Sequence, residues 1–289
     1  MGLKPSYTLH GNYRMPMGFP AARFASALAY RARPSDIFIA TYPKCGTTWV
    51  QYIVYLLLHD GVPLQEDQPL GRSIPHLEEV GRAPIEKLPE PRAIKTHFSF
   101  AMTPAHPEAR YIYVARNPFD CVVSFYHHTR GFPQHYDFSD GTFADYFECF
   151  LAGEVDFGDY FDNLTSWVDH RDDPNVLFLT YEAMKSDARK ALVAIAEFLA
   201  LPCSGDKAKL DEILHHSSFA NMRKGQRRWS TQRLEDMPAF VRKGIVGDWQ
   251  NYFSPDQAYR LADKFSARAA TSAIECLWPD IIRTARLMN

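Results

Sequence analysis

The chain has 289 residues, of which 46% are hydrophobic and 14% aromatic, so it is long enough to bury the core of one large α/β domain. Its formal net charge of −2 at neutral pH argues against binding to nucleic acid or general attraction to acidic membranes. We expect a single domain over residues 1–289.

Neither a targeting signal nor a disulfide framework is indicated. Residues 1–20 lack the apolar core of a secretory signal, and no apolar run is long enough to span a membrane. The five cysteines, at positions 45, 121, 149, 203 and 276, form no CxxC pair, which fits reduced thiols. We therefore expect a cytoplasmic protein with neither nucleic acid nor a membrane as a partner. Phe19, in the aromatic N-terminal arm, is expected in one wall of a pocket.

The first strongly patterned stretch follows a short helix candidate at residues 21–30. Residues 37–42 are β-branched and aromatic, which predicts a buried strand. From Thr47 to about His59 the apolar residues recur about every 3.6 positions, which predicts a helix. The residues expected on its inner face are Val50, Ile53, Val54, Leu57 and Leu58.

The turn between this strand and this helix is a candidate anion site. A helix start presents unpaired backbone N–H groups and the positive end of the helix dipole, and Lys44 adds a cation. The turn is not a GxxxxGK[ST] loop, because no glycine opens it and the lysine precedes Gly46. An ordinary strand–turn–helix connection with a surface lysine is the alternative.

Two further strands end in polar residues. Residues 61–92 hold six prolines and predict a long functional loop, after which residues 91–97 form a strand that delivers Lys95 and His97 on one face. A second strand at 111–115 leads to Arg116, and Asn117-Pro118 predicts the start of a helix that carries Ser124. Ligands of open α/β sheets bind at such carboxyl ends.

The rest of the chain repeats the alternation of strand and helix. A strand is predicted at 176–181 and a helix at 182–201, whereas 226–241 is charged and aperiodic. Residues 242–249 combine two glycines and two cations in a loop suited to an anion, and a helix is predicted at 256–270. This order predicts a mainly parallel central sheet flanked by helices on both faces.

Six segments together resemble the cytosolic sulfotransferase family over nearly the whole chain. They are TYPKCGTTW (41–49), KTH (95–97), ARNPFDCVVSFYHH (115–128), FLTYE (178–182), SSF (217–219) and RKGIVGDW (242–249). The resemblance implies a doubly wound α/β domain with a strand–loop–helix phosphosulfate-binding turn. It also implies an enzyme that moves the sulfuryl group of 3′-phosphoadenosine 5′-phosphosulfate (PAPS) to an acceptor hydroxyl or amine, leaving 3′-phosphoadenosine 5′-phosphate (PAP).

The resemblance further implies which positions bind the donor. The 41–49 loop would hold the 5′-phosphosulfate, with Trp49 also beside the adenine. Arg116, Ser124 and residues 242–244 match positions that hold the 3′-phosphate, and Tyr181 and Phe219 match contacts to the adenosine. The expected donor-binding residues are Lys44, Cys45, Gly46, Thr47, Thr48, Trp49, Arg116, Ser124, Tyr181, Phe219, Arg242, Lys243 and Gly244.

Lys95 and His97 match the positions nearest the transferred group. We expect His97 to be the general base, with a pKa near neutrality, and Lys44 and Lys95 to stabilise charge on the sulfuryl group and the leaving phosphate. Ser124 completes the expected catalytic set. No metal is expected, because no carboxylate or Cys/His cluster has convincing ligand spacing.

The acceptor pocket is expected to include Phe19, His97 and three residues, His76, Glu79 and His128, at positions where the family often has aromatic side chains. In one interpretation these loops run differently and the three side chains face water. In the other the pocket is more polar than a steroid site and Glu79 meets an ammonium group, which favours phenols and phenolic amines of the catecholamine type. A steroid- or alcohol-preferring sulfotransferase is an alternative.

Other departures from the family concern the loops and assembly. Cys45 stands where serine is usual and Phe119 where lysine is common. The family has a dimer signature near the carboxyl terminus, a spaced Lys, Thr-Val and Glu. The aligned positions here hold Gln250, Ser254-Pro255 and Tyr259, so the signature is not kept and a monomer or weak dimer is expected. Two rival functions are a kinase, disfavoured by the missing GxxxxGK[ST], and a protein that binds the donor nucleotide or a small ligand without turnover.

Overall fold

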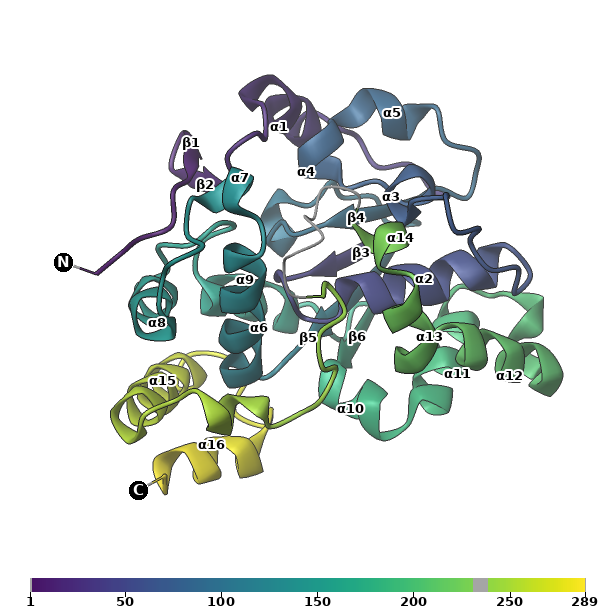
Figure 1. The fold of residues 1–289 in the computed structure, drawn as a ribbon. Coiled ribbons are helices and arrows are strands. Elements are labelled where there is room, and N and C mark those ends of the chain that lie inside the picture. Colours follow the sequence, from purple (N-terminus) through teal and green to yellow (C-terminus); the bar gives the residue numbers. More distant parts are fainter. Residues whose placement is uncertain (1, 231–238, 289) are drawn as a thin grey trace.

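A four-stranded parallel sheet lies at the centre of the computed structural model, which describes residues 2–230 and 239–288 (Figure 1). Its strand order is β4–β3–β5–β6, with β3 paired to both β4 and β5. The mainly parallel sheet predicted from the sequence is thus confirmed. The strands are β3 (Ile37–Thr41), β4 (Ala93–Thr96), β5 (Arg110–Ala115) and β6 (Val176–Thr180).

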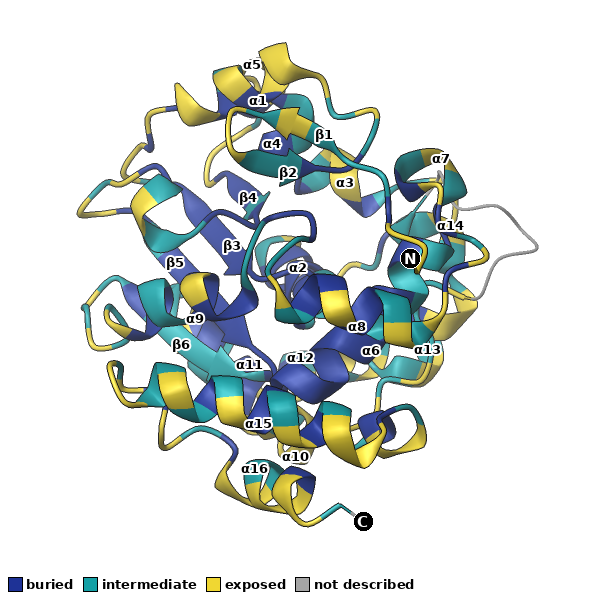
Figure 2. Ribbon diagram, turned by 90° about the vertical axis from the view of Figure 1, so that its left-hand side faces the viewer, coloured by how far each residue is buried: buried dark blue, intermediate teal, exposed yellow. Residues whose placement is uncertain are grey.

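Helices cover both faces of this sheet because its strands are apolar on both sides. Along β3, Ile37 and Ile39 face one buried cluster, whereas Phe38 and Ala40 face the other. Figure 2 shows that many of the buried residues lie on the strands and on the helices beside them. The first cluster includes residues of α2 (Thr47–Leu58), α10 (Tyr181–Ser186), α11 (Ala188–Phe198) and α12 (Lys207–His216); the second includes residues of α1 (Ala21–Leu28), α6 (Pro118–Arg130), α8 (Phe143–Leu151), α9 (Tyr160–Val168) and α15 (Pro255–Ala269).

Helix α2 begins and ends as the sequence predicts, but it is buried on more than one face. Val50, Ile53 and Val54 are buried as expected, and Leu58 is only half-buried. Tyr52 and Leu56 are buried as well, because α2 contacts α3 (Leu70–Ser73), α11 and α12 in addition to the sheet. The first turn of α2 is therefore held rigidly at the edge of the sheet.

The start of α6 also follows the prediction. Asn117 caps the helix, its Oδ1 accepting the amide N–H of Asp120 at 2.9 Å, and Pro118 occupies the first turn. Phe119, which stands where lysine is common, is fully buried, and its ring centroid lies 4.9 Å from that of Trp249 and 5.5 Å from that of Phe253. Phe119 therefore fastens the segment around Trp249 to the core.

Two predictions about regular structure are wrong. Residues 61–92 are not a plain loop, because they contain α3, α4 (Leu77–Val80) and α5 (Arg82–Glu86). The single helix expected at 182–201 is divided at Asp187, whose backbone is not helical and whose Oδ1 caps α11 by accepting the N–H of Lys190 at 2.9 Å.

Helix α15 was expected and begins with Ser254 as its cap and Pro255 in its first turn, which gives Pro255 a local structural role. In the described residues no helix is long and apolar enough to cross a membrane. The other elements are β1 (Thr8–His10), β2 (Tyr13–Met15), η1 (Phe100–Met102), α7 (Pro133–Tyr136), η2 (Pro202–Gly205), α13 (Phe219–Lys224), α14 (Gln226–Trp229), η3 (Asp248–Asn251) and α16 (Pro279–Arg286); the rest of the aperiodic segment 226–241 lies largely outside the described residues.

Candidate functional site

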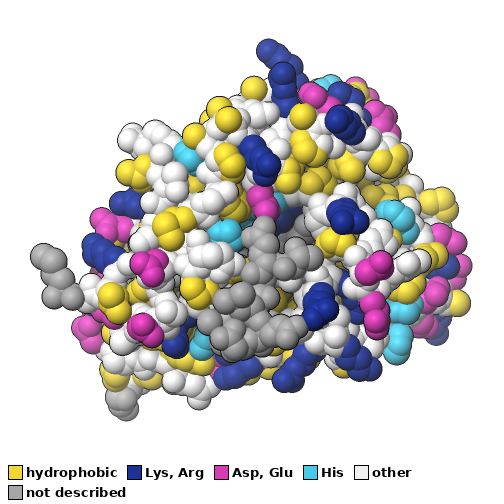
Figure 3. Space-filling model, turned by 45° about the horizontal axis from the view of Figure 1, so that its top comes forward, with side chains coloured by type: hydrophobic (Ala, Val, Ile, Leu, Met, Phe, Trp, Pro, Cys, Tyr) yellow, Lys and Arg dark blue, Asp and Glu magenta, His cyan; other side chains and the backbone are white. Residues whose placement is uncertain are grey.

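A cavity of about 770 Å³ lies at the carboxyl edge of the parallel sheet. The segments that follow β3, β4 and β5 deliver Lys44, His97 and Arg116 to it, and Tyr181 follows β6 directly. Figure 3 shows the hollowed surface, with acidic, basic and histidine side chains gathered at its rim. The topology thus brings residues that are far apart in sequence to one place, as expected for an open α/β sheet.

Nearly all the site residues predicted from the sequence line this cavity. The exception is Cys45, which is buried in the core and has its Sγ 3.8 Å from Sγ of Cys121. Burial raises the pKa of the Cys45 thiol well above its ordinary value, so the thiol stays protonated. The predicted residues that line the cavity are Phe19, Lys44, Gly46, Thr47, Thr48, Trp49, His76, Glu79, Lys95, His97, Arg116, Ser124, His128, Tyr181, Phe219, Arg242, Lys243 and Gly244.

The turn after β3 is strained and is held from several sides. Lys44 has a φ of 71°, a left-handed conformation that is uncommon for residues other than glycine. Its Nζ lies 3.2 Å from Nδ1 of His128, and its carbonyl oxygen accepts a hydrogen bond of 3.1 Å from Nη1 of Arg116. Gly46, the N-cap of α2, has a φ of 98°, and a Cβ there would lie 2.9 Å from the ring of Tyr181.

This turn exposes the amino end of a twelve-residue helix to the cavity. Gly46 has no side chain to cap the helix, so the first N–H groups of α2 are left for a bound group. Thr47 and Thr48, in that first turn, also line the cavity. With Lys44 beside them, these groups fit a phosphate or sulfate better than any uncharged group.

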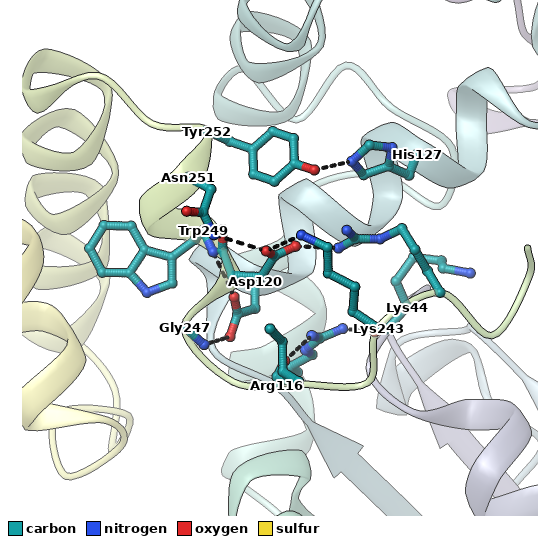
Figure 4. A network of polar contacts seen from close by, with 12 residues as sticks. Lys44, Arg116, Asp120, His127, Lys243, Gly247, Trp249, Asn251 and Tyr252 are labelled. Carbon is teal, nitrogen blue, oxygen red and sulfur yellow. Dashed lines mark hydrogen bonds and ion pairs between the residues drawn. The ribbon is translucent and has the colours of Figure 1, made fainter. Parts of the chain in front are cut away.

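A second cationic cluster lies on the segment 242–249 (Figure 4). Arg242 and Lys243 each donate to the carboxylate of Asp248 at 2.6 Å. Nη2 of Arg116 donates to the carbonyl oxygen of Ile245 at 3.2 Å. The buried Nε of Arg116 has no hydrogen-bond partner in the part of the chain that the structure describes. Asp120 fixes the loop from α6 by accepting the N–H groups of Gly247 at 2.8 Å and Trp249 at 3.0 Å.

Aromatic side chains lie between these two cationic clusters. The guanidinium of Arg116 lies 4.4 Å from the ring centroid of Tyr181, and the ring of Trp49 is 5.8 Å from that of Tyr181. Gly244 has a φ of 62°, and a Cβ there would lie 2.5 Å from the ring of Phe219, so only glycine allows this approach. The cavity therefore combines flat aromatic surface, on which a planar ring could stack, with two cationic clusters.

His97 is held in a single tautomer. Its Nδ1 lies 2.7 Å from the carbonyl oxygen of Thr41, which can only accept, so Nδ1 carries the proton and Nε2 has a free lone pair. Burial lowers the pKa of His97 well below its ordinary value, and the neighbouring Lys95 and His76 lower it further. The near-neutral pKa expected from the sequence is therefore wrong, and the imidazole is neutral at physiological pH.

Glu78 holds the backbone of His97 by a hydrogen bond, and no pattern in the sequence indicates this role. Its Oε1 accepts the backbone N–H of His97 at 2.6 Å and the hydroxyl of Thr96 at 2.9 Å. Burial acts to raise the pKa of Glu78, but His76 and the amide of His97 lower it overall, so the carboxylate is ionised. The signal was concealed because Glu78 lies in a short helix within a segment of little periodicity.

The residues expected in the acceptor pocket lie next to His97. The ring of His76 is 4.9 Å from that of His97 and 5.7 Å from that of Phe19. Oε2 of Glu79 is 3.6 Å from Nδ1 of His76, and this contact lowers the pKa of Glu79 to about 2. His76 is buried at the cavity and does not face water, which contradicts the first of the two interpretations for this residue.

Asp156 is a second functional candidate that the sequence analysis missed. It lines the cavity and is 1% exposed. Its Oδ2 accepts the hydroxyl of Tyr136 at 2.8 Å, whereas its Oδ1 has no hydrogen-bond partner within residues 2–230 and 239–288. Burial raises the pKa of Asp156 to about 7. An isolated aspartate in a loop between two helices carries no recognisable pattern. Lys185, on α10, also lines the cavity, and its Nζ lies 5.8 Å from the ring centroid of Trp49; a single lysine on a helix likewise forms no recognisable pattern.

Within the described ranges, no three His, Cys, Asp or Glu residues are grouped so that they could hold a metal ion. The cationic side chains of Lys44, Lys95 and Arg116 line the cavity. The arrangement can therefore offset negative charge with lysine and arginine side chains and with backbone N–H groups.

We predict that Asp156→Asn stabilises the protein above neutral pH. The folded-state pKa of about 7 exceeds the ordinary value of 3.8, so the folded protein retains a proton that the unfolded chain has lost, and stability falls as pH rises between these values. The penalty removed at about pH 8 is at most about 4 kcal/mol. Urea unfolding at about pH 8 and pH 4 should show a gain that nearly disappears at the lower pH.

Asparagine keeps an oxygen that can accept the Tyr136 hydroxyl, so the substitution leaves that contact available. Glu154→Gln, at an exposed carboxylate two positions away, is the matched control. Unchanged or reduced stability of Asp156→Asn at about pH 8 would contradict the raised pKa.

Comparison with known proteins places this arrangement in a family. The sulfotransferase domain model matches residues 34–272. The chain is 34% identical over 281 residues to sulfotransferase 1B1 of the dog, covering 88% of this chain and 92% of that protein, and 35% identical over 244 residues to human sulfotransferase 1E1, covering 78% and 81%. It superposes on the crystal structure of mouse sulfotransferase SULT7A1 complexed with PAP, with a TM-score of 0.75, 28% identity and 98% of both chains covered. The chain belongs to the sulfotransferase family.

Proposed function

We propose that this sulfotransferase moves the sulfuryl group of PAPS to a hydroxyl or amine of a small acceptor, and that the acceptor is a phenol or a phenolic amine of the catecholamine type. The observation that carries the proposal is the pair of cationic clusters at one aromatic-lined cavity, one at the amino end of α2 and one at residues 242–245. A donor with a phosphosulfate at one end of its nucleoside and a further phosphate on the ribose requires two such clusters. The structural similarity to a sulfotransferase complexed with PAP supports the choice of donor.

In this proposal the donor supplies the sulfuryl group, and the chain binds and orients it. Lys44, the amino end of α2 and its two threonines hold the phosphosulfate, whereas Arg116, Ser124 and residues 242–244 hold the 3′-phosphate. The Nε–H of Arg116, which has no partner among the described residues, is a donor that can form a hydrogen bond with a bound phosphate. Tyr181, Trp49 and Phe219 offer ring surface to the adenine.

The chemistry at the acceptor side requires a proton acceptor and compensation of charge. Nε2 of His97 takes the proton of the attacking hydroxyl, because Nδ1 is committed to the carbonyl oxygen of Thr41. Lys44 and Lys95 stabilise the charge that develops on the sulfuryl oxygens and the leaving phosphate. Ser124, on α6, belongs to the same proposed catalytic set and lines the same cavity.

We predict that Lys243→Met weakens PAP binding by about 10- to 100-fold, because one charge-assisted hydrogen bond to the 3′-phosphate is lost. Binding of adenosine 5′-phosphosulfate should change little, since it lacks that phosphate. Isothermal titration calorimetry with both nucleotides measures the difference, and Lys190→Met, at an exposed lysine on α11, is the control. Equal losses for both nucleotides, or equal wild-type affinity for both, would show that there is no 3′-phosphate site.

We predict that His97→Ala lowers the turnover number about 10²- to 10⁴-fold, because the general base is lost. PAP affinity should persist, since His97 lies on the acceptor side. A labelled-donor transfer assay at saturating donor and acceptor measures turnover, and His215→Ala, at an exposed histidine, is the control. Turnover close to that of the wild type would remove His97 from the mechanism.

We predict that Glu79→Gln lowers the preference for tyramine over 4-ethylphenol by about two- to fivefold in kcat/KM, the amount expected for a partly exposed ion pair. The side chain of Glu79 is 38% exposed, and its pKa of about 2 keeps it ionised across the assay range. Glu86→Gln, at an exposed carboxylate of α5, serves as the control. A wild-type preference for uncharged steroids over phenolic amines would refute the acceptor class.

A further inference from the structure

Asp156 is a carboxylate whose second oxygen is not used by the fold. Tyr136 donates to Oδ2 at 2.8 Å, whereas Oδ1 is buried and has no hydrogen-bond partner among the described residues. None of the ion pairs among the described residues includes Asp156. A buried carboxylate that serves only the fold normally has both oxygens satisfied, so the free oxygen needs another explanation.

The immediate neighbours of Asp156 contact the residues that are proposed to take part in the reaction. The next residue, Phe157, has its ring centroid 4.8 Å from that of His97 and 5.9 Å from that of His76. On the other side, the ring of Tyr136 is 6.0 Å from that of His128. Nδ1 of His128 in turn lies 3.2 Å from Nζ of Lys44. Asp156 therefore lies in the cavity wall between the residues assigned to proton transfer and those assigned to the phosphosulfate.

We propose that Oδ1 of Asp156 accepts a hydrogen bond from a second hydroxyl of the acceptor, next to the hydroxyl that is sulfated, so that the enzyme selects catechols over monophenols. This inference rests on the proposed function and deepens it. It makes Asp156 a specificity-determining residue for the acceptor. The aromatic side chains of Tyr136, which donates to Oδ2, and of the adjacent Phe157 line the same cavity and supply apolar surface for the ring of a catechol.

A hydroxyl fits this position better than an ammonium group does. Asp156 is 1% exposed, and removing an ammonium completely from water costs far more than removing a hydroxyl. The ammonium of Lys44 acts on the carboxyl of Asp156 as a positive charge, and it would repel a cation there. Glu79, at 38% exposure, lets an ammonium keep part of its hydration. The two carboxylates therefore divide the work, with Asp156 receiving a hydroxyl and Glu79 a cation.

The raised pKa of Asp156 is consistent with this division. A carboxyl that titrates at about 7 gains the full value of a charge-assisted hydrogen bond only when a donor reaches Oδ1. A bound catechol supplies that donor and shifts the carboxyl towards its ionised form. The free energy needed to keep an ionised carboxyl buried is then offset by this hydrogen bond in the complex with the acceptor.

The test compares three acceptors that differ only beside the reacting hydroxyl: 4-methylcatechol, 4-methylphenol and 2-methoxy-4-methylphenol. With labelled PAPS, we expect kcat/KM of the wild type for the catechol to exceed that for 4-methylphenol by about tenfold or more, beyond the statistical factor of about two for its two hydroxyls. The methoxy compound occupies similar space but cannot donate, so it should show no such advantage. Asp156→Asn, whose amide nitrogen donates instead of accepting, should reduce the ratio to about two. Glu154→Gln should leave the ratio as in the wild type.

Each outcome decides the matter. Equal kcat/KM for the three acceptors in the wild type, or an undiminished catechol preference in Asp156→Asn, overturns the inference while phenol sulfation by the same enzyme stands. If the protein binds PAP but transfers label to none of the three, the proposed acceptor class fails and the role of Asp156 fails with it. If Asp156→Asn does not fold, the comparison of the catechol with its methoxy analogue in the wild type still gives the answer.

Discussion

The guanidinium of Arg116 joins the two halves of the site. One of its nitrogens donates to the carbonyl oxygen of Lys44 in the turn after β3, and another donates to the carbonyl oxygen of Ile245 in the segment 242–249. Its face lies over the ring of Tyr181, so a third segment is fixed by the same side chain. Because Arg116 follows a central strand, it transfers the rigidity of the sheet to loops that have little regular structure.

The carboxylates around the cavity keep the other cationic and basic groups in place. Asp248 holds Arg242 and Lys243, and Asp120 in turn holds the backbone on both sides of Asp248. Glu78 performs the same task for the backbone of His97. These supports are hydrogen-bonded and mostly buried, which reduces the freedom that the cationic side chains lose when an anion binds.

The strongest sequence patterns predicted the framework and the strand–helix junctions that line the cavity. The β3–α2 and β5–α6 junctions were predictable because strand period, glycine or proline position and helix period agree there. The break at Asp187 was not, since the apolar period continues across it and only the side-chain cap reveals the division. Glu78 and Asp156 were missed because each is a single polar residue whose meaning depends on neighbours from other segments. The pKa of His97 was misjudged for the same reason, since burial and Lys95 determine it.

The close approach of Gly244 to Phe219 joins two parts of the molecule that would otherwise respond separately. The ring of Phe219 rests where a side chain at 244 would have to be, so any shift of the ring displaces the backbone beside Lys243. In the proposed binding mode, the contact of Phe219 with the heterocycle and that of Lys243 with the ribose phosphate are therefore thermodynamically linked. Fragments that carry only one of these groups should bind with free energies whose sum falls short of that of the intact nucleotide, because neither fragment alone orders both contacts.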